Sequence, residues 1–216
     1  MRYDLVIFDN DGVLVDSEPI SNRILAEYLT ELGYPTTYED SLRDYMGAAV
    51  HRIHDVVLER SGERLPAEFD AIFHGRVFDA FRRQLEPVDG VADVLEKLAV
   101  EEVPYCVGSS GSHARIRVAL GKTGLFDRFG AERIFSSQDV GRGKPAPDLF
   151  LHAARVMGVA PQRCAVVEDS VLGVRAAVAA GMDVFGFTAM TPAAQLAEAG
   201  ATALFREMAE LPGLLQ

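Results

Sequence analysis

The sequence predicts an α/β fold, in which a doubly wound parallel sheet carries a small inserted α-helical domain. Short apolar runs alternate with helical patterns along most of the chain, beginning with residues 5–8. Such alternation indicates parallel strands joined by right-handed helical crossovers. Residues 17–86 differ, because apolar positions recur there at helical spacing without a convincing strand. A chain of 216 residues fits one large domain or two small ones.

We expect a Rossmann-like core of residues 1–16 and 87–216 and a helical cap domain of residues 17–86. Strands are expected at residues 5–8, 104–108, 133–135, 165–167, 183–187 and 202–205, and helices at 20–32, 53–60, 69–81, 91–98, 112–120 and 145–157, with a further helix ending near residue 181. The insertion leaves the first strand at its carboxyl end, the edge at which open parallel sheets bind ligands. A small helical domain in that place can act as a lid.

Composition narrows the classes of partner. The net charge of −11 would repel nucleic acid and acidic membranes. No apolar run approaches the ~20 residues that span a bilayer, and the chain begins with a strand pattern rather than a signal peptide. Cys106 and Cys164 lie in apolar runs, so we interpret them as reduced core residues rather than as a disulfide or metal pair. We therefore expect a cytoplasmic protein, a monomer or weak homodimer, that binds a small molecule.

The first strand ends in two carboxylates, Asp9 and Asp11, followed by Gly12, which allows a sharp bend. Both acids would lie at the carboxyl edge of the sheet, where ligands bind. Taken alone, this stretch is explained equally well as an ordinary Asp–Gly turn after a strand. Three later segments of the chain favour a ligand-binding site over an ordinary turn.

Two of these segments supply groups that bind anions. Ser109 follows the strand at 104–108 and precedes a helix start, whose free N–H groups favour an anion. Helix capping by Ser112 is the alternative explanation of these hydroxyls. Lys144, one of three lysines in the chain, precedes Pro145, which suits the first position of a helix and holds the lysine on the loop before it. A solvated surface lysine is the alternative here.

The last segment is an apolar strand that ends in Glu168 and Asp169. Adjacent acids at a helix start could simply complement the helix dipole. If the strands at 5–8 and 165–167 are neighbours, however, four carboxylates meet, and two charges ~4 Å apart repel by about 4 kcal/mol at an effective dielectric of 20. Several such pairs would rival the ~5–15 kcal/mol stability of a domain. Lys144 and a hard divalent cation, for which Mg²⁺ is well suited, would neutralise them.

Together and in this order, the four segments resemble the motifs of the haloacid dehalogenase superfamily. The resemblance covers essentially the whole chain and is to the phosphatases with a small helical cap, in the branch of β-phosphoglucomutase-like proteins and sugar-phosphate phosphatases. The residues that carry it are Asp9-Asn10-Asp11-Gly12-Val13, Ser109, Lys144 before Pro145-Ala146-Pro147-Asp148, and Glu168-Asp169-Ser170.

The resemblance implies a catalytic role for four residues. Asp9 would attack phosphorus to form an aspartyl-phosphate, and Asp11 would protonate the leaving oxygen and then deprotonate water. Ser109 and Lys144 would hold the phosphoryl oxygens. An aspartate with the ordinary pKa of ~3.9 is already a carboxylate at neutral pH, so Asp9 would need no separate base.

The resemblance also implies the ligands of the cofactor, Mg²⁺. They would be Asp9, the carbonyl of Asp11 and Asp169, with Glu168 ligating or assisting nearby. The residues expected at the substrate are Asn10, through its backbone N–H, Ser110, and the cap residues Gly47, His51, Arg52 and Arg76.

These assignments predict a Mg²⁺-dependent phosphomonoester hydrolase that acts on a small phosphorylated metabolite, namely a sugar, polyol or sugar-acid phosphate. Asp11 argues against dehalogenation, because the dehalogenases of the superfamily lack this second acid. Phosphonate hydrolysis uses a cap lysine, and residues 17–86 contain none. A β-phosphoglucomutase-type mutase is the nearer alternative, but its histidine after the first motif aligns with Ser21, and residues 46–50 lack the basic side chain of its cap loop. A non-catalytic phosphate-binding domain is the remaining alternative.

Overall fold

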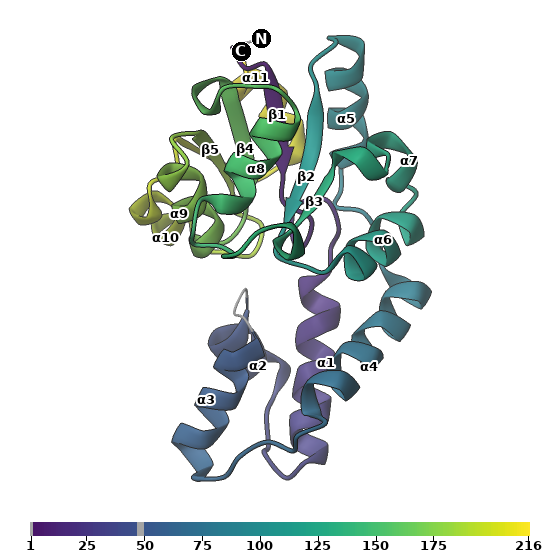
Figure 1. Ribbon diagram of the computed structural model, residues 1–216. Coiled ribbons are helices and arrows are strands. Elements are labelled where there is room, and N and C mark those ends of the chain that lie inside the picture. Colours follow the sequence, from purple (N-terminus) through teal and green to yellow (C-terminus); the bar gives the residue numbers. More distant parts are fainter. Residues whose placement is uncertain (1, 47–49) are drawn as a thin grey trace. The chain divides into compact units, whose positions relative to one another are not determined.

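The computed structural model describes residues 2–46 and 50–216 and contains a six-stranded sheet with the order β3-β2-β1-β4-β5-β6 (Figure 1). Every neighbouring pair in this sheet is parallel. The strands are β1 (Leu5–Phe8), β2 (Tyr105–Ser109), β3 (Ile134–Ser136), β4 (Cys164–Glu168), β5 (Asp183–Phe187) and β6 (Ala203–Phe205). The predicted doubly wound α/β fold is confirmed, and its strand order is that of the Rossmann fold.

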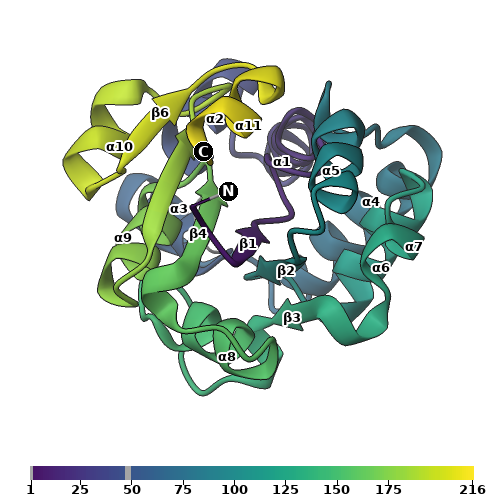
Figure 2. The same cartoon turned by 90° about the horizontal axis from the view of Figure 1, so that it is seen from above.

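Helices cover both faces of this sheet (Figure 2). They are α5 (Val91–Val100), α6 (His113–Lys122), α7 (Phe126–Phe129), α8 (Asp148–Val156), α9 (Val171–Ala179), α10 (Ala193–Ala199) and α11 (Leu211–Leu214). Leu5 and Ile7 of β1 pack in one apolar cluster with residues of α8, α9 and α10. Because side chains alternate along a strand, Val6 and Phe8 face the opposite side, and all four are fully buried. A strand buried on both faces explains the uninterrupted apolar run of β1.

The chain divides into two compact units, residues 1–16 with 86–216 and residues 17–85. Glu86, which we expected in the helical insertion, lies with the sheet, because its carbonyl accepts a hydrogen bond from the Asp16 N–H at 3.0 Å. No helix in the described parts of either unit is long and apolar enough to cross a membrane.

The second unit is helical. It consists of α1 (Glu18–Glu31), α2 (Tyr38–Tyr45), α3 (Val50–Ser61) and α4 (Phe69–Gln84). The sequence predicted three of these helices and missed α2, although Thr37 and Asp40 form a reciprocal capping box at its start. The Thr-x-x-Asp spacing indicates the start of α2, which the spacing of the apolar residues does not.

Helix α8 begins later than the sequence predicts. We expected Pro145 at its first position, but the helix begins at Asp148, after Pro147. A proline disfavours helical geometry in the residue before it, so Ala146 cannot easily continue a helix into Pro147. The Ala146 N–H instead closes a turn onto the Gly143 carbonyl at 3.0 Å. Lys144 therefore lies within a turn, four residues before the first residue of the helix, Asp148.

The two cysteines are buried and free, as the sequence predicts. Cys106 pairs in register with Ile7 on one side of β1, and Cys164 pairs with Leu5 on the other. Strand β1 therefore separates the two sulfur atoms. Burial raises the pKa of both thiols, to about 11 for Cys164, so both remain protonated at neutral pH.

Candidate active site

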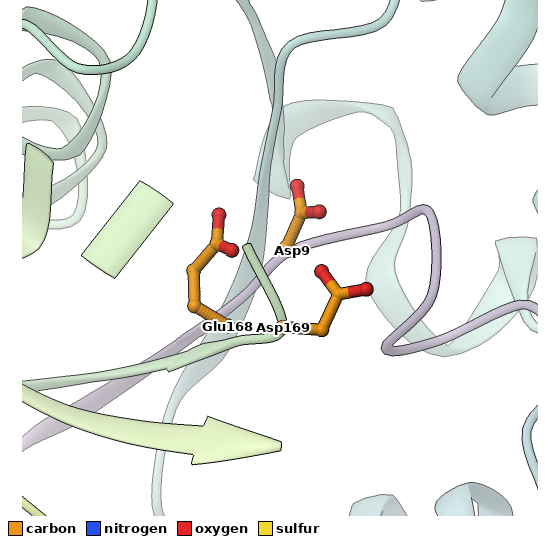
Figure 3. A group of neighbouring side chains, drawn as sticks. All are labelled: Asp9, Glu168 and Asp169. Atoms are coloured by element: carbon orange, nitrogen blue, oxygen red, sulfur yellow. The ribbon is translucent and has the colours of Figure 1, made fainter. Parts of the chain in front are cut away.

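The site lies where the strand order changes direction, at the carboxyl ends of β1 and β4. Asp9 follows β1 directly, and its N–H donates to the Val167 carbonyl of β4 at 2.9 Å. Glu168 is the last residue of β4, and Asp169 comes next. Carboxylate oxygens of Asp9, Glu168 and Asp169 lie within 4.8 Å of one another, and all three residues are buried. Figure 3 shows the three carboxyl groups on the same side of the strand ends.

Two glycines leave room for these carboxylates. Gly12 has a φ of +78°, and a Cβ there would overlap the Asp169 carboxylate. A Cβ at Gly173, in the first turn of α9, would overlap the Glu168 carboxylate. At Gly12 both the left-handed backbone and the close approach require glycine. The loops after β1 and β4 are therefore shaped around the acids that they carry.

Lys144 joins two of these carboxylates. Its Nζ lies 2.7 Å from Asp9 Oδ1 and 2.6 Å from Glu168 Oε1, and its side chain is only 5% exposed. The other oxygen of Glu168, Oε2, accepts hydrogen bonds from the backbone N–H and the hydroxyl of Ser170, both at 2.9 Å. Both oxygens of Glu168 are thus held by neighbours in the protein.

The charges of this group do not balance. Asp9, Glu168, Asp169 and Lys144 together carry a formal charge of −2 when all are ionised. Burial raises the pKa of Asp9 above its usual range, while the adjacent Lys144 ammonium acts in the opposite direction. Burial alone would lower the pKa of Lys144, but the Asp9 and Glu168 carboxylates raise it above its usual value. A divalent cation beside Asp9 would lower the pKa of Asp9 and favour its carboxylate form, for the same electrostatic reason as Lys144.

The Asp11 carboxylate is held by Arg115, a residue that the sequence analysis missed. The Arg115 Nη2 donates to Asp11 Oδ1 at 2.7 Å, and Nε donates to the same oxygen at 3.2 Å. The amide of Asn10 donates to Asp11 Oδ2 at 3.2 Å. The sequence does contain one indication of this role. Arg115 lies in the first turn of a helix, where a cation is disfavoured by the helix dipole and so needs a nearby anion.

The serine segment lies at the end of the adjacent strand. Ser109 is the last residue of β2 and is 1% exposed, and its Oγ accepts the Gly111 N–H at 3.0 Å. Ser110 is exposed, and its carbonyl accepts a hydrogen bond from Ser137. Ser112 caps α6 by accepting the Arg115 N–H. Capping therefore explains Ser112, whereas Ser109 is directed into the loop rather than onto the helix.

The residues expected on the cap belong to the separate helical unit. His51 is exposed, and Arg52 lies 3.5 Å from Glu59 on the same helix. Arg76 donates to both oxygens of Glu31, at 2.9 and 2.8 Å, and its guanidinium lies over the Tyr28 ring. These contacts join α4 to α1, and the expected contact of Arg76 with the substrate stays a prediction. Gly47 lies outside the described residues.

The sequence of the chain is similar to those of a family of hydrolases. The model of the haloacid dehalogenase-like hydrolases matches residues 3–181. The 6-phosphogluconate phosphatase of Escherichia coli K12 is 33% identical over 189 residues, which cover 87% of this chain and 84% of that protein. Hexitol phosphatase A of the same strain is 30% identical over 200 residues, which cover 92% of this chain and 89% of that protein.

Solved structures show the same fold. A haloacid dehalogenase-like protein of Agrobacterium tumefaciens strain C58 has a TM-score of 0.89 at 39% identity, and the match covers 99% of this chain and 97% of that one. A hydrolase of the same family from Deinococcus radiodurans R1, solved with bound phosphate and sodium, has a TM-score of 0.84 at 32% identity. That match covers 99% of this chain and 95% of the other.

Proposed function

The chain belongs to the haloacid dehalogenase-like hydrolase family, and on that premise we propose that it is a Mg²⁺-dependent phosphatase that forms an aspartyl-phosphate at Asp9. Family membership and the phosphatase relatives support hydrolysis of the phosphomonoester of a small metabolite. The observation that carries the mechanism is the buried contact of Lys144 with Asp9 and Glu168, beside Asp169.

Asp9 is the nucleophile in this mechanism. One of its oxygens is held by Lys144, which leaves the other to attack phosphorus. As the new bond to Asp9 forms, the bond from phosphorus to the leaving oxygen breaks, and Asp11, which begins this half protonated, gives that oxygen its proton. In the second half, Asp11 takes a proton from water, whose oxygen bonds to phosphorus. The bond between phosphorus and Asp9 then breaks, and inorganic phosphate leaves with both aspartates restored.

Lys144 and Ser109 are proposed to hold the phosphoryl oxygens. Phosphoryl transfer depends mainly on positioning and on neutralising charge spread over those oxygens. Lys144 is buried at 5% exposure, so its ammonium acts in a medium where charge interactions are stronger than in water. Ser109 offers a hydroxyl hydrogen from the end of β2, while its oxygen is engaged by the Gly111 N–H. Both groups flank the carboxyl end of β1.

The residues present fit Mg²⁺. Asp9 and Asp169 would hold it through carboxylate oxygens, together with the backbone carbonyl of Asp11, because hard cations take oxygen ligands. The glycine at position 12 keeps the space beside Asp169 clear of a side chain. When bound, the ion neutralises charge on the phosphoryl group and lowers the repulsion between the acids.

Glu168 is proposed to position Lys144 rather than to bind the metal directly. Its Oε1 faces Lys144, and its Oε2 accepts two hydrogen bonds from Ser170. A carboxylate with both oxygens engaged in this way orients its neighbour, as groups behind metal ligands commonly do.

The proposed substrates are phosphorylated sugars, polyols or sugar acids, in keeping with the relatives that act on 6-phosphogluconate and hexitol phosphates. Substrate contact remains a prediction for Ser110, for the backbone N–H of Asn10, and for four residues of the helical unit, namely Gly47, His51, Arg52 and Arg76. A mutase is less well supported, because the curated relatives described above are phosphatases.

Phosphate release from a panel of phosphorylated sugars, polyols and sugar acids tests the proposal. We expect release with Mg²⁺, none after chelation with EDTA, and recovery when excess Mg²⁺ is added. The Asp9→Asn variant is the negative control, because it keeps the size of the side chain and lacks the nucleophile. Failure of the wild type to release phosphate from any member, including p-nitrophenyl phosphate, would contradict the proposed activity.

A further inference from the structure

Arg115 occupies a place that helix stability does not explain. It lies in the first turn of α6, three residues after the N-cap Ser112, and that turn contains no acidic residue. A cation at this end of a helix meets the positive end of the helix dipole, which disfavours it. The side chain is nevertheless largely buried, at 18% exposure. Its position therefore requires another stabilising partner.

That partner is the Asp11 carboxylate. The Arg115 guanidinium reaches Oδ1 with Nη2 at 2.7 Å and with Nε at 3.2 Å, and Nε also lies 3.4 Å from Oδ2. The Asp11 side chain is 19% exposed, so the pair is mostly withdrawn from water. The planar guanidinium holds a carboxylate in a fixed direction better than a flexible ammonium does. One residue thus fixes an acid that lies 104 positions away in the sequence.

Asn10 supplies a second donor to the same carboxylate. Its Nδ2 donates to Asp11 Oδ2 at 3.2 Å, and the residue is fully buried. Its Oδ1 is buried without a hydrogen-bond partner among the residues that the structure describes. An unsatisfied buried amide oxygen is unfavourable, and an apolar side chain here would avoid that cost. The donor half of the amide is the half that has a partner, and that partner is Asp11.

The loop between them is shaped to let the arginine pass. A Cβ at Gly111 would lie 3.3 Å from Arg115 Cδ and 3.3 Å from Ser109 Oγ. Both distances are tighter than ordinary packing, so the absence of a side chain at Gly111 gives the arginine stem its path to Asp11. The same glycine also places its N–H on Ser109. The serine loop and the Arg115 stem are thus packed against one another.

We propose that Arg115 is a positioning residue for Asp11 and that Asn10 assists it. Together they fix the direction in which the Asp11 carboxyl group faces the oxygen that leaves phosphorus or attacks it. The inference rests on the proposed function, in which Asp11 gives its proton to the leaving oxygen and later takes one from water. Transfer of a proton requires alignment to within hydrogen-bond reach, so a freely rotating Asp11 would do both steps less often.

The inference predicts a dependence on the leaving group. An alkoxide leaves phosphorus poorly without a proton, whereas p-nitrophenolate is stable enough to leave almost without one. Loss of the alignment should therefore slow cleavage of an alkyl phosphate much more than cleavage of p-nitrophenyl phosphate. A residue with a merely structural role would lower both rates by the same factor.

The test compares Arg115→Gln with Arg117→Gln, which removes the same charge from the exposed face of the same helix. For each variant, kcat/KM is measured on β-glycerophosphate and on p-nitrophenyl phosphate. We expect Arg115→Gln to lose at least about tenfold more on the alkyl ester, within the range of general acid catalysis, while Arg117→Gln keeps the wild-type ratio. With p-nitrophenyl phosphate we also expect Arg115→Gln to release a burst of one p-nitrophenolate per enzyme. In this variant a misaligned Asp11 makes the attack of water on the aspartyl-phosphate the slow step.

Two further variants keep the test decisive. Arg115→Lys retains the charge without the planar fork and should fall between wild type and Arg115→Gln in the same ratio. Asn10→Leu should change the ratio in the same direction by a smaller factor, about threefold, because the 3.2 Å contact of Asn10 with Asp11 is long for a hydrogen bond. If Arg115→Gln does not fold, these two variants carry the test. Equal losses on both esters, no loss, or a gain would overturn the inference. A wild type inactive on both esters would instead contradict the proposed function.

Discussion

Asp9 and Asp11 lie two residues apart on one loop, yet their surroundings differ. Asp9 is held by Lys144, a buried lysine that also contacts Glu168. Asp11 is held by Arg115, and both members of that pair are nearly one-fifth exposed. The carboxylate of Asp9 belongs to a buried group whose formal charge is −2 when all its members are ionised. The carboxylate of Asp11 instead contacts one guanidinium, that of Arg115.

This difference suits two kinds of chemistry. A nucleophile that receives a phosphoryl group benefits from burial and fixed cations, which exclude water and stabilise added negative charge. A group that exchanges protons with an alcohol and then with water must instead face the solvent side and keep its direction. Sequence spacing alone makes the two aspartates look alike. Their partners, Lys144 and Arg115, distinguish them.

The sharpest way to break this comparison is to remove the nucleophile. Asp9→Asn keeps the size of the side chain but cannot form the aspartyl-phosphate, so we expect kcat to fall at least about 10³-fold. Without metal, the melting temperature should stay level or rise, because one charge leaves a mutually repelling group. Steady-state phosphate release and thermal denaturation in EDTA measure the two effects.

Asp4→Asn is the matched control for this variant, because Asp4 precedes β1 at its other end and is half-exposed in a pair with Arg163. It should keep wild-type turnover. Turnover of Asp9→Asn within tenfold of the wild type would show that Asp9 is not the nucleophile.

The next largest effect concerns the metal on the Asp9 side. Asp169→Asn removes a proposed ligand, and the Mg²⁺ concentration for half-maximal activity should rise at least about 100-fold, since even residues behind the ligands change affinity by 10–100-fold. Binding also has a readout without catalysis, because Mg²⁺ should raise the melting temperature of the wild type and not that of the variant. Ser109→Ala should keep the thermal shift, and equal shifts in both variants would exclude Asp169 as a ligand.

A smaller effect separates positioning from ligation at Glu168. In Glu168→Gln the side chain keeps an oxygen for either Lys144 or Ser170 but not for both. We expect kcat/KM to fall about tenfold through loss of Lys144 alignment, while Mg²⁺ affinity changes less than in Asp169→Asn. Isothermal titration with Mg²⁺ gives the second quantity directly. A loss of Mg²⁺ affinity as large as that of Asp169→Asn would make Glu168 a ligand.

The Asp9 side of this comparison could be predicted from the sequence. Asp9, Glu168 and Asp169 follow apolar strands directly, and parallel strands bring their carboxyl ends to one edge of the sheet. The position of Lys144 on a loop was also predicted, although the start of α8 was placed at Pro145 instead of Asp148. Local patterns and sheet topology together were sufficient for these residues.

The Asp11 side could not be predicted in the same way. Arg115 lies within a helix whose apolar pattern gives no hint of a partner 104 residues away. That contact depends on the direction of α6 relative to the β1 loop, which no local pattern encodes. Its unfavourable place in the helix dipole was a signal, but one that points to a partner without identifying it. Likewise, Asn10 was assigned a backbone role, and its side-chain contact with Asp11 emerged only from the structure.

The last prediction is that an added bisphosphate does not change the rate of phosphate release. It concerns the fate of the aspartyl-phosphate on Asp9, which Asp11 can expose to attack by water. A mutase must keep water from the aspartyl-phosphate until its sugar returns, whereas a hydrolase lets Asp11 activate water at once. The mutases that this chain resembles place a histidine where Ser21 lies, and the Ser21 hydroxyl is buried with no hydrogen-bond partner among the described residues. A serine stays neutral near physiological pH and cannot reproduce the charge change of imidazole.

We therefore expect glucose 1,6-bisphosphate to leave the rate of phosphate release from β-glucose 1-phosphate unchanged. Parallel assays of inorganic phosphate and glucose 6-phosphate follow the two products. Formation of glucose 6-phosphate faster than phosphate, and only with the bisphosphate present, would make the protein a mutase.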